Sequence, residues 1–339
     1  MTSLAALAAA LGVFAGLAAA RRHRRVCVVP PELRHPSLYV PISLRGATSL
    51  RIARRLIARA ASAAVVTGAV RLRSERVPAA GGRPAVRVLV YEPPDRTRPS
   101  GALLWIHGGG LVMGTPEQGH ELCSRVVEEL GVVVASVDYR LAPEHPFPAG
   151  LEDCYAALAW LAAQADALGI DPTRVAIGGD SAGGGLAACL AQLAHDRGGP
   201  AISFQLLQYP MLDDRTALRA GLDAFVWTQT SNRFGWSAYL GGLRDAEPRP
   251  YASAARRVDL RGLPPAWIGI GDIDLFHAEC VDYANRLRAA GVPCELYVVP
   301  GMYHGADRLA PAAPITRTFL ERMTSALAAA TSSRPGRRV

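Results

Sequence analysis

The sequence predicts an α/β fold, in which a mostly parallel β-sheet carries helices on both faces. Short, continuous apolar runs recur along the chain, and such runs are typical of strands that are buried on both sides. Between them lie longer stretches in which apolar residues recur at helical spacing, and this alternation of strand and helix indicates a doubly wound sheet. The chain has 339 residues, of which 50% are hydrophobic, so it is long enough to bury a large core.

Eight strands are expected, the first beginning near residue 65. In chain order they lie in VVTGAVRLRSERV, AVRVLVYEP, GALLWIHGGG, VVVASVDY, RVAIGGDS, ISFQLLQYP, PAWIGIGD and CELYVVPG. The first two alternate polar and apolar residues, whereas the others are nearly continuous apolar runs. Helices are expected between them in PEQGHELCSRVVEEL, AGLEDCYAALAWLAAQA, SAGGGLAACLAQLAHD and FHAECVDYANRLRAAG.

Two segments do not fit this alternation. LRIARRLIARAASAAV, at residues 50–65, has apolar residues at helical spacing with arginines between them and predicts an amphipathic helix. Residues 211–258 separate two strands by more than a crossover requires and hold many of the few aromatic residues. Because long insertions at strand ends are commonly functional, we expect part of a lid here, with a purely structural excursion as the alternative.

Charge is distributed unevenly along the chain. All 37 basic residues are arginines, and the formal net charge is +8. Residues 1–76 hold 13 arginines and two glutamates, a net charge of +11, which leaves about −3 for the rest. Such asymmetry is typical of a surface for nucleic acid or anionic membranes, or of a solvated segment. Nucleic acid is not expected as a partner, because the arginines are not interleaved with stacking aromatic residues.

The first 20 residues are apolar and uncharged, and RRHRR follows at residues 21–25. A cleavable secretion signal carries its positive charges before the apolar run. The length suits one membrane span with the main body on the cytoplasmic side. Alanine is only weakly hydrophobic, so an ordinary surface helix is the alternative. We therefore expect a cytoplasmic protein in which residues 1–25 are the candidate for membrane association.

Six cysteines are scattered along the chain without a CxxC pair. This pattern favours buried thiols in a reducing compartment over disulfides or a zinc site. The oligomeric state is left open between monomer and dimer.

The sequence GGDSAGG, at residues 178–184, predicts a nucleophilic serine. Gly179, Ser181 and Gly183 match G-x-S-x-G between an expected strand and an expected helix. In that context the turn holds a serine hydroxyl at the carboxyl edge of the sheet, where the start of the helix favours negative charge. A phosphate-binding glycine turn over residues 183–188 is a weaker reading, because it begins inside the expected helix.

A serine hydroxyl needs a base to take its proton. His304 follows the last expected strand, so it is expected at the same sheet edge as Ser181. The base in turn needs a carboxylate, and Asp272 and Asp274 both follow the preceding strand. The residues alone do not separate these two, since either can cap the next helix. The order Ser, Asp, His is the one found in α/β-hydrolases.

HGGG, at residues 107–110, follows another expected strand. Its glycines allow backbone N–H groups to converge where side chains would not fit. Together with the N–H of Ala182, next after the serine, they are expected to form an oxyanion hole.

Taken together, these motifs resemble the hormone-sensitive-lipase-like family of α/β-hydrolase carboxylesterases. The resemblance covers residues 65–330 and rests on HGGG, DYRLAPEHPFPA, GDSAGG, GDIDLFHAE and YHG. It implies an α/β-hydrolase fold with eight strands and a helical cap. It also implies the following roles: Ser181 as nucleophile, Asp274 as acid, His304 as base, Gly109, Gly110 and Ala182 as oxyanion donors, and His107, Gly108 and Asp180 as supporting residues.

The resemblance further divides the chain into parts. Residues 26–64 would form an N-terminal cap region, residues 65–330 the catalytic domain with the cap insertion at 211–258, and residues 331–339 a basic tail. It implies a small-molecule ester substrate and neither a metal nor an organic cofactor. Two positions depart from the family pattern: Ala306 replaces an aromatic residue, and Ala278-Glu279 replaces an Asp-Glu pair.

We therefore expect a serine carboxylesterase that hydrolyses short to medium acyl-chain esters through an acyl-enzyme. The alternatives within the enzyme class are a lipase, a deacetylase or an amidase acting on bulkier substrates. The alternative of another class is a non-catalytic small-molecule receptor on the same fold, which would be expected to lose a member of the triad.

Overall fold

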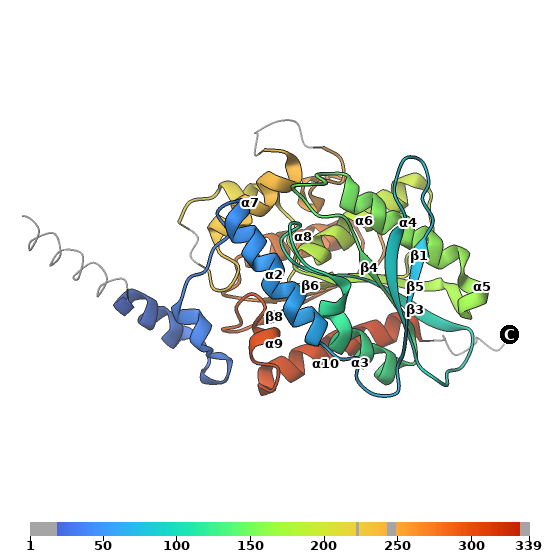
Figure 1. Cartoon of the computed structure of the whole chain (residues 1–339), viewed down its shortest axis with the longest axis horizontal. Helices are drawn as coiled ribbons and strands as arrows, with labels where there is room; N and C mark the ends of the chain where they lie inside the picture. The colour runs from blue at the N-terminus through green and yellow to red at the C-terminus, as the bar shows by residue number, and fades with distance from the viewer. Residues whose placement is uncertain (1–18, 222–223, 243–248, 333–339) are drawn as a thin grey trace, which may run out of the picture.

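The computed structural model describes residues 19–221, 224–242 and 249–332. At its centre lies one eight-stranded sheet with the strand order β1-β2-β4-β3-β5-β6-β7-β8 (Figure 1). Strand β2 is antiparallel to both β1 and β4, and all other neighbours are parallel. The strands are β1 (Arg71–Val77), β2 (Val86–Glu92), β3 (Ser100–Ile106), β4 (Val133–Asp138), β5 (Ile170–Asp180), β6 (Phe204–Gln208), β7 (Ala266–Gly271) and β8 (Cys294–Val299). The predicted fold class and all eight expected strands are confirmed.

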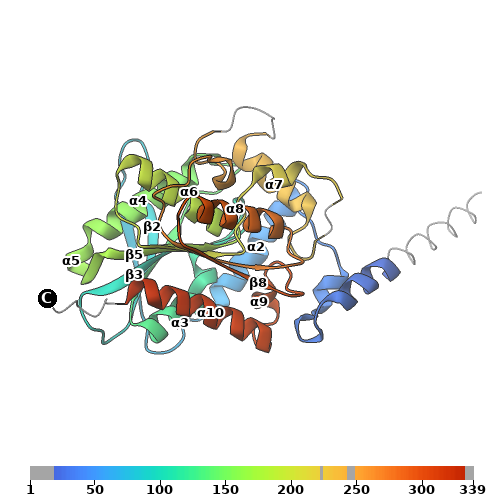
Figure 2. The same cartoon turned by 180° about the vertical axis from the view of Figure 1, so that it is seen from behind.

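Helices cover both faces of the sheet (Figures 1 and 2). Helices α3 (His120–Leu130) and α10 (Pro314–Thr331) lie on one face. Helices α4 (Ala149–Ala163), α6 (Ala182–Arg197) and α8 (His277–Ala289) lie on the other, and α5 (Ala165–Leu168) follows α4. Helix α10 was not among the expected elements; its buried Phe319, Met323 and Leu327 recur every four residues and place one stripe against the sheet.

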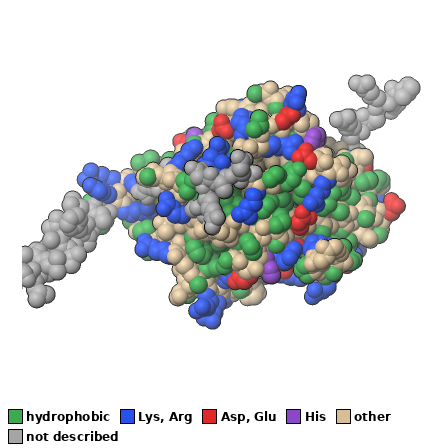
Figure 3. Space-filling model, turned by 90° about the horizontal axis from the view of Figure 1, so that it is seen from above, with side chains coloured by type: hydrophobic (Ala, Val, Ile, Leu, Met, Phe, Trp, Pro, Cys, Tyr) green, Lys and Arg blue, Asp and Glu red, His purple; other side chains and the backbone are tan. Residues whose placement is uncertain are grey.

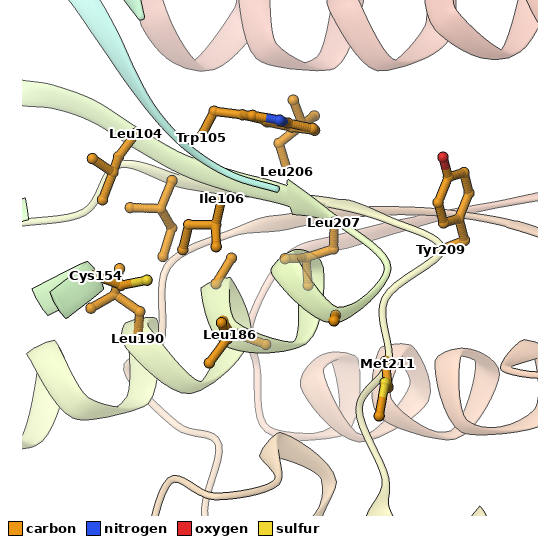
Figure 4. Close-up of a cluster of buried hydrophobic side chains, with 14 of the residues drawn as sticks. Leu104, Trp105, Ile106, Cys154, Leu186, Leu190, Leu206, Leu207, Tyr209 and Met211 are labelled. Carbon is orange, nitrogen blue, oxygen red and sulfur yellow. The ribbon is translucent and has the colours of Figure 1, made fainter. Parts of the chain in front are cut away.

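The central strands are buried on both sides, as their apolar sequences require. Every residue of β3 and of β7 is buried. In Figure 4, Ile106 of β3 and Leu207 of β6 point toward Leu186 of α6, whereas Trp105 points to the opposite face. Successive side chains of a strand point to opposite faces of the sheet. The side chains of one strand therefore contribute to the core on both faces.

The glycines after Ser181 are explained by packing. A Cβ atom at Gly183 would lie 2.0 Å from the carbonyl oxygen of Ile106, and one at Gly185 would lie 2.0 Å from that of Met211. The first turn of α6 therefore touches the backbone of its neighbours directly. This close approach accounts for the glycine run without a bound phosphate.

Two helical regions lie at the same end of the molecule, near the carboxyl ends of the parallel strands (Figure 1). The first holds a helical stretch at 19–28, the 3₁₀ turns η1 (Pro31–Leu33) and η2 (Pro36–Tyr39), and α2 (Ala47–Ala63). The second holds η4 (Asp214–Leu218), α7 (Gln229–Leu240) and η5 (Ala254–Arg256). They are joined where the N–H of Leu44 donates to Ser231 Oγ at 2.9 Å and Ser43 Oγ lies 2.7 Å from Thr228 Oγ1.

Several expectations concern the ends of the chain. Residues 1–18 of the apolar N-terminal segment and residues 333–339 of the basic tail lie outside the described residues. Within the described ranges, no helix has the length and apolar character needed to cross a bilayer. All six cysteines are free: four are buried, Cys294 is partly buried and Cys27 is exposed.

Candidate active site

Ser181 occupies the turn between β5 and α6. Its φ of +54° lies in a region that side-chain-bearing residues rarely adopt, and the residue is buried. The turn is held from both sides, because the N–H of Ser181 donates to Gln208 at 2.9 Å and its carbonyl accepts from Met211 at 2.9 Å. Strain of this kind persists only where neighbouring structure enforces it, and here it fixes the direction of the serine hydroxyl.

Three expected residues from separate loops meet at this turn. His304 Nε2 lies 2.9 Å from Ser181 Oγ, and His304 Nδ1 lies 2.8 Å from Asp274 Oδ2. All three residues are buried. A proton on Nδ1 donated to the carboxylate leaves Nε2 as the acceptor for the serine hydroxyl, which is the arrangement of a nucleophile, a base and an orienting acid.

The structure separates the two aspartates that the sequence left equivalent. Asp274 turns one carboxylate oxygen to His304 and accepts the N–H of Phe276 on the other, at 2.9 Å. Asp272 accepts the N–H of Gly301 at 2.6 Å instead. Asp274 therefore holds both the start of α8 and the histidine, whereas Asp272 ties together two loops.

His304 is packed between two aromatic rings. Its imidazole meets Tyr209 edge-on with 4.9 Å between ring centroids, and Phe276 edge-on at 5.1 Å. Tyr209 also lies next to Asp307, whose carboxylate accepts hydrogen bonds from the tyrosine hydroxyl at 3.2 Å and from Gln208 at 3.0 Å. Burial raises the pKa of Asp307. The Tyr209 and Phe276 rings restrict the rotation of the His304 imidazole.

The glycine loop after β3 approaches the serine turn. Gly109 and Gly110 both have positive φ, +124° and +62°, which glycine adopts without strain. Within the described parts of the chain, the N–H groups of Gly109, Gly110 and Ala182 have no hydrogen-bond acceptor. A Cβ at Gly110 would lie 2.1 Å from the ring of Trp227, so the insertion packs directly on this loop.

Asp180 connects the glycine loop to the histidine loop. One of its oxygens accepts the N–H of Gly108 at 3.0 Å, and the other accepts from Arg308 at 2.8 Å. Asp180, which precedes Ser181, is therefore bonded to Gly108 and to Arg308. Gly108 lies just before the two candidate oxyanion glycines, and Arg308 lies four positions after His304. A supporting role is expected for Asp180 from the sequence, but its partner Arg308 is not.

His107 has the surroundings of a brace. Its ring stacks on Tyr139 with centroids 4.3 Å apart, and Nδ1–H donates to the carbonyl of Gly108 at 2.8 Å. The Tyr139 hydroxyl donates to the carbonyl of His107 at 2.9 Å. Burial lowers the pKa of His107, so the ring is neutral. It is bonded to the glycine loop through Gly108.

The two departures from the family pattern leave the three-residue arrangement intact. Ala306 is buried. Glu279 is buried and accepts hydrogen bonds from the N–H groups of Leu212 and Asp213 at 2.6 and 3.2 Å and from the Thr216 hydroxyl. It anchors the start of the insertion, a role that sequence reasoning missed. Among the described residues, no group of His, Cys, Asp or Glu is arranged to hold a metal ion.

A serine on a strained turn between strand and helix, at the carboxyl edge of a mostly parallel sheet, defines the class of α/β-hydrolases. Comparison with known families agrees: the model of a family described by its alpha/beta hydrolase fold matches residues 103–308. The chain belongs to this family.

The relatives it resembles are esterases. Carboxylesterase NlhH of Mycobacterium tuberculosis is 36% identical over 292 residues, which are 85% of this chain and 91% of that protein. Ethyl acetate hydrolase of Pseudomonas putida is 38% identical over 66% of this chain and 71% of its own length. The solved structure of a bacterial heroin esterase superposes with a TM-score of 0.85 at 37% identity, covering 91% of this chain and 99% of that one. The chain is a carboxylic-ester hydrolase, and its substrate is a small-molecule ester.

Proposed function

We propose that this esterase uses Ser181 as nucleophile, His304 as base and Asp274 as orienting acid, and that it prefers esters with short to medium acyl chains. The observation that supports the first part is the line of two hydrogen bonds, 2.9 and 2.8 Å long, from Ser181 through His304 to Asp274.

In the first half of the reaction, Ser181 Oγ attacks the ester carbonyl while His304 Nε2 takes the hydroxyl proton. The imidazolium that forms is stabilised by Asp274, which already accepts from Nδ1. The carbonyl oxygen becomes an oxyanion in the tetrahedral intermediate. When the intermediate collapses, the C–O bond to the alcohol breaks, and the alcohol leaves with the proton from His304.

The oxyanion is proposed to bind the free N–H groups of Gly109, Gly110 and Ala182. One such donor is typically worth about 2.7–4 kcal/mol of barrier. In the second half of the reaction, His304 takes a proton from water, the hydroxide attacks the acyl-serine, and collapse returns the proton to Ser181 and releases the acid.

The substrate range is proposed from the relatives and the insertion. One relative is named for ethyl acetate, a small ester. In this chain the buried ring of Trp227 lies against the glycine loop, which limits the space beside the oxyanion site. We assign residues 26–64 and the insertion at 211–258 to a cap that bounds the acyl site, and residues 65–330, which include that insertion, to the catalytic domain.

We also propose that residues 1–25 associate with a membrane, on the strength of the apolar sequence followed by RRHRR. Membrane fractionation of cells expressing the full chain, compared with a chain lacking residues 1–25, tests this. The full chain should be recovered with membranes. Equal recovery of both chains would contradict it.

The serine mechanism is tested with Ser181→Ala on p-nitrophenyl butyrate. We expect kcat to fall by roughly 10⁴-fold or more, since removal of a catalytic serine has effects of this order, with an unchanged circular dichroism spectrum. Ser62→Ala, at an exposed serine of α2, is the matched control and should retain full activity. Full activity of Ser181→Ala would refute the assignment.

Acyl preference is tested with p-nitrophenyl esters from acetate to palmitate on the full chain. We expect kcat/KM to be highest between two and eight carbons and to fall at longer chains. A kcat/KM that rises steadily to palmitate would instead favour a lipase. A fluorophosphonate probe that labels the wild type but not Ser181→Ala separates an enzyme from a non-catalytic receptor.

A further inference from the structure

Exposed apolar side chains are concentrated near the N-terminal end of the described chain. Eleven large hydrophobic residues of the described ranges are prominently exposed, and seven of them lie between residues 28 and 65. These seven are Val28, Tyr39, Val40, Ile42, Ile52, Leu56 and Val65. Scattered exposed apolar residues are ordinary, but a cluster of them commonly marks a surface that binds something.

The same region is strongly basic. Residues 33–74 contain eight arginines and no aspartate or glutamate. Figure 3 shows basic side chains at the end of the molecule from which the grey N-terminal residues extend, and others over the rest of that face. Two of these arginines are paired with carboxylates: Arg54 with Glu144, and Arg73 with Glu75 and Glu92. The remaining arginines, together with the exposed apolar side chains, are complementary to a surface that is both anionic and apolar.

Helix α2 shows how the two properties are combined. Arg51, Arg55 and Arg59 recur every four residues, and Ile52 and Leu56 follow the first two of them. All five are exposed, and residues at this spacing share one side of a helix. We call these five residues the α2 face. No carboxylate in the described ranges forms an ion pair with its three arginines.

The opposite side of α2 is fixed to the rest of the protein. Leu50 and Ala61 are buried. Arg54 donates from Nε to the carbonyl of Val112 at 2.7 Å, from Nη2 to that of Ala142 at 2.9 Å, and forms an ion pair with Glu144. The helix is therefore anchored beside the glycine loop, and its α2 face has no partner within the described chain.

We propose that the α2 face docks on an anionic lipid surface. Arginines flanking isoleucine and leucine on one exposed helical side are typical of helices that lie in the membrane interface, where cations contact lipid headgroups and apolar side chains enter the acyl boundary. Long arginine stems suit this arrangement because they extend past buried apolar groups to reach headgroups. The site is separate from residues 1–25, which the sequence alone put forward for membrane association.

Docking at this face would set the orientation of the enzyme. A groove of about 610 Å³, lined by Leu50 and Ala58 of α2 and by Phe234 and Ala238 of α7, lies beside the α2 face. Through Arg54, the same helix is bonded to the loop that carries the proposed oxyanion glycines. This consequence rests on the proposed function: lipid docking would bring the cap, and hence ester hydrolysis, next to substrates dissolved in the bilayer.

The test is co-sedimentation of the full chain with vesicles of phosphatidylglycerol and phosphatidylcholine, 1:1, in low salt. We expect binding that weakens at least tenfold in 0.5 M NaCl and on pure phosphatidylcholine, because screening and loss of anionic lipid remove the attraction. The variant R51Q/R55Q/R59Q should lose binding at least tenfold, and I52S/L56S at least fivefold.

Two control variants remove an exposed apolar side chain and an exposed arginine at positions outside α2. Val258 and Arg261 are exposed far from α2 in sequence, so V258S and R261Q should bind vesicles like the wild type. All variants should keep the circular dichroism spectrum of the wild type. Ser181→Ala should bind vesicles like the wild type, which separates docking from the proposed catalytic site.

The proposal is overturned if both α2 variants bind vesicles like the wild type, which would assign any binding to residues 1–25. It is also overturned if the wild type does not bind these vesicles but binds immobilised poly-glutamate or RNA, since the basic surface would then bind an acidic macromolecule.

Discussion

Asp180 and Arg308 form an ion pair at 2.8 Å between residues 128 positions apart in the sequence. The first precedes the serine and the second follows the histidine by four positions. Asp180 also accepts the N–H of Gly108. A single carboxylate thus sets the spacing of the three loops on which the proposed chemistry depends.

Replacement of this carboxylate should reduce catalysis more than folding. For Asp180→Asn, we expect kcat to fall about 10- to 100-fold, which corresponds to about 1.4–2.7 kcal/mol, with a small change in KM, because the loops lose their common charge partner. Kinetics with p-nitrophenyl butyrate measure both constants. Asp259→Asn, in the exposed Asp259–Arg261 pair, is the matched control and should change neither. Equal effects of the two variants would argue against the bridge.

The two neighbouring aspartates should differ sharply. Asp274→Asn removes the charge that faces His304 Nδ1, so we expect kcat to fall roughly 10³- to 10⁴-fold, as orienting carboxylates do in serine hydrolases. Asp272→Asn keeps an oxygen that can accept from Gly301 and should cost less than threefold. The ratio of the two kcat values is the measurement, and a reversed ratio would contradict the assignment.

The contact between the insertion and the glycine loop can be measured by a pair of glycine variants. Gly110→Ala adds a methyl group that would lie 2.1 Å from the Trp227 ring and strains a φ of +62°. Gly81→Ala strains a similar φ of +57° but meets nothing within 4 Å. We expect Gly81→Ala to cost about 1 kcal/mol of unfolding free energy and Gly110→Ala clearly more. Similar melting temperatures of the Gly110→Ala and Gly81→Ala variants would show that the insertion moves away from the added methyl group at little cost.

Glu279 should make stability depend on pH. Burial raises its pKa to about 8, against the partly opposing effect of its hydrogen bonds. The folded chain then holds a proton that the unfolded chain releases above about pH 4.5, so the free energy of unfolding falls as pH rises from there to about 8, by up to about 1.4 kcal/mol per unit.

Denaturant unfolding between pH 5 and pH 8.5 measures this slope. Glu279→Gln cannot ionise and should flatten it, so that wild type loses more stability than the variant as pH rises. Glu295→Gln, at an exposed glutamate of β8, should keep the wild-type slope. A Glu279→Gln variant with an unchanged slope would place the titration elsewhere.

The sequence predicted the parts of the fold and site that depend on local pattern. Apolar runs marked the strands, and a parallel sheet places the ends of such strands at one edge, so Ser181 and His304 followed from their positions after β5 and β8. Alternation along a strand did not separate Asp272 from Asp274, because the chain turns after β7 and no longer alternates there. The resemblance to a known family favoured Asp274, and its hydrogen bond to His304 Nδ1 supports the role that we propose for it.

Contacts between distant segments were beyond sequence reasoning. The local sequence around Arg308 does not indicate that its guanidinium forms an ion pair with Asp180. The sequence showed Glu279 only as the glutamate of a family Asp-Glu pair whose aspartate is replaced by Ala278. Its contacts with Leu212 and Asp213 identify it as an anchor for the insertion. Helix α10 was not predicted, although Phe319, Met323 and Leu327 recur at a spacing of four residues that favours a helix.

The glycine run at the start of α6 sets a practical boundary for redesign. Since backbone atoms of Ile106 and Met211 already occupy the space a methyl group would need at Gly183 and Gly185, libraries that randomise these positions should yield mostly misfolded chains. Engineers seeking altered acyl selectivity would do better to vary Trp227, a ring carried by an inserted segment rather than by the central sheet.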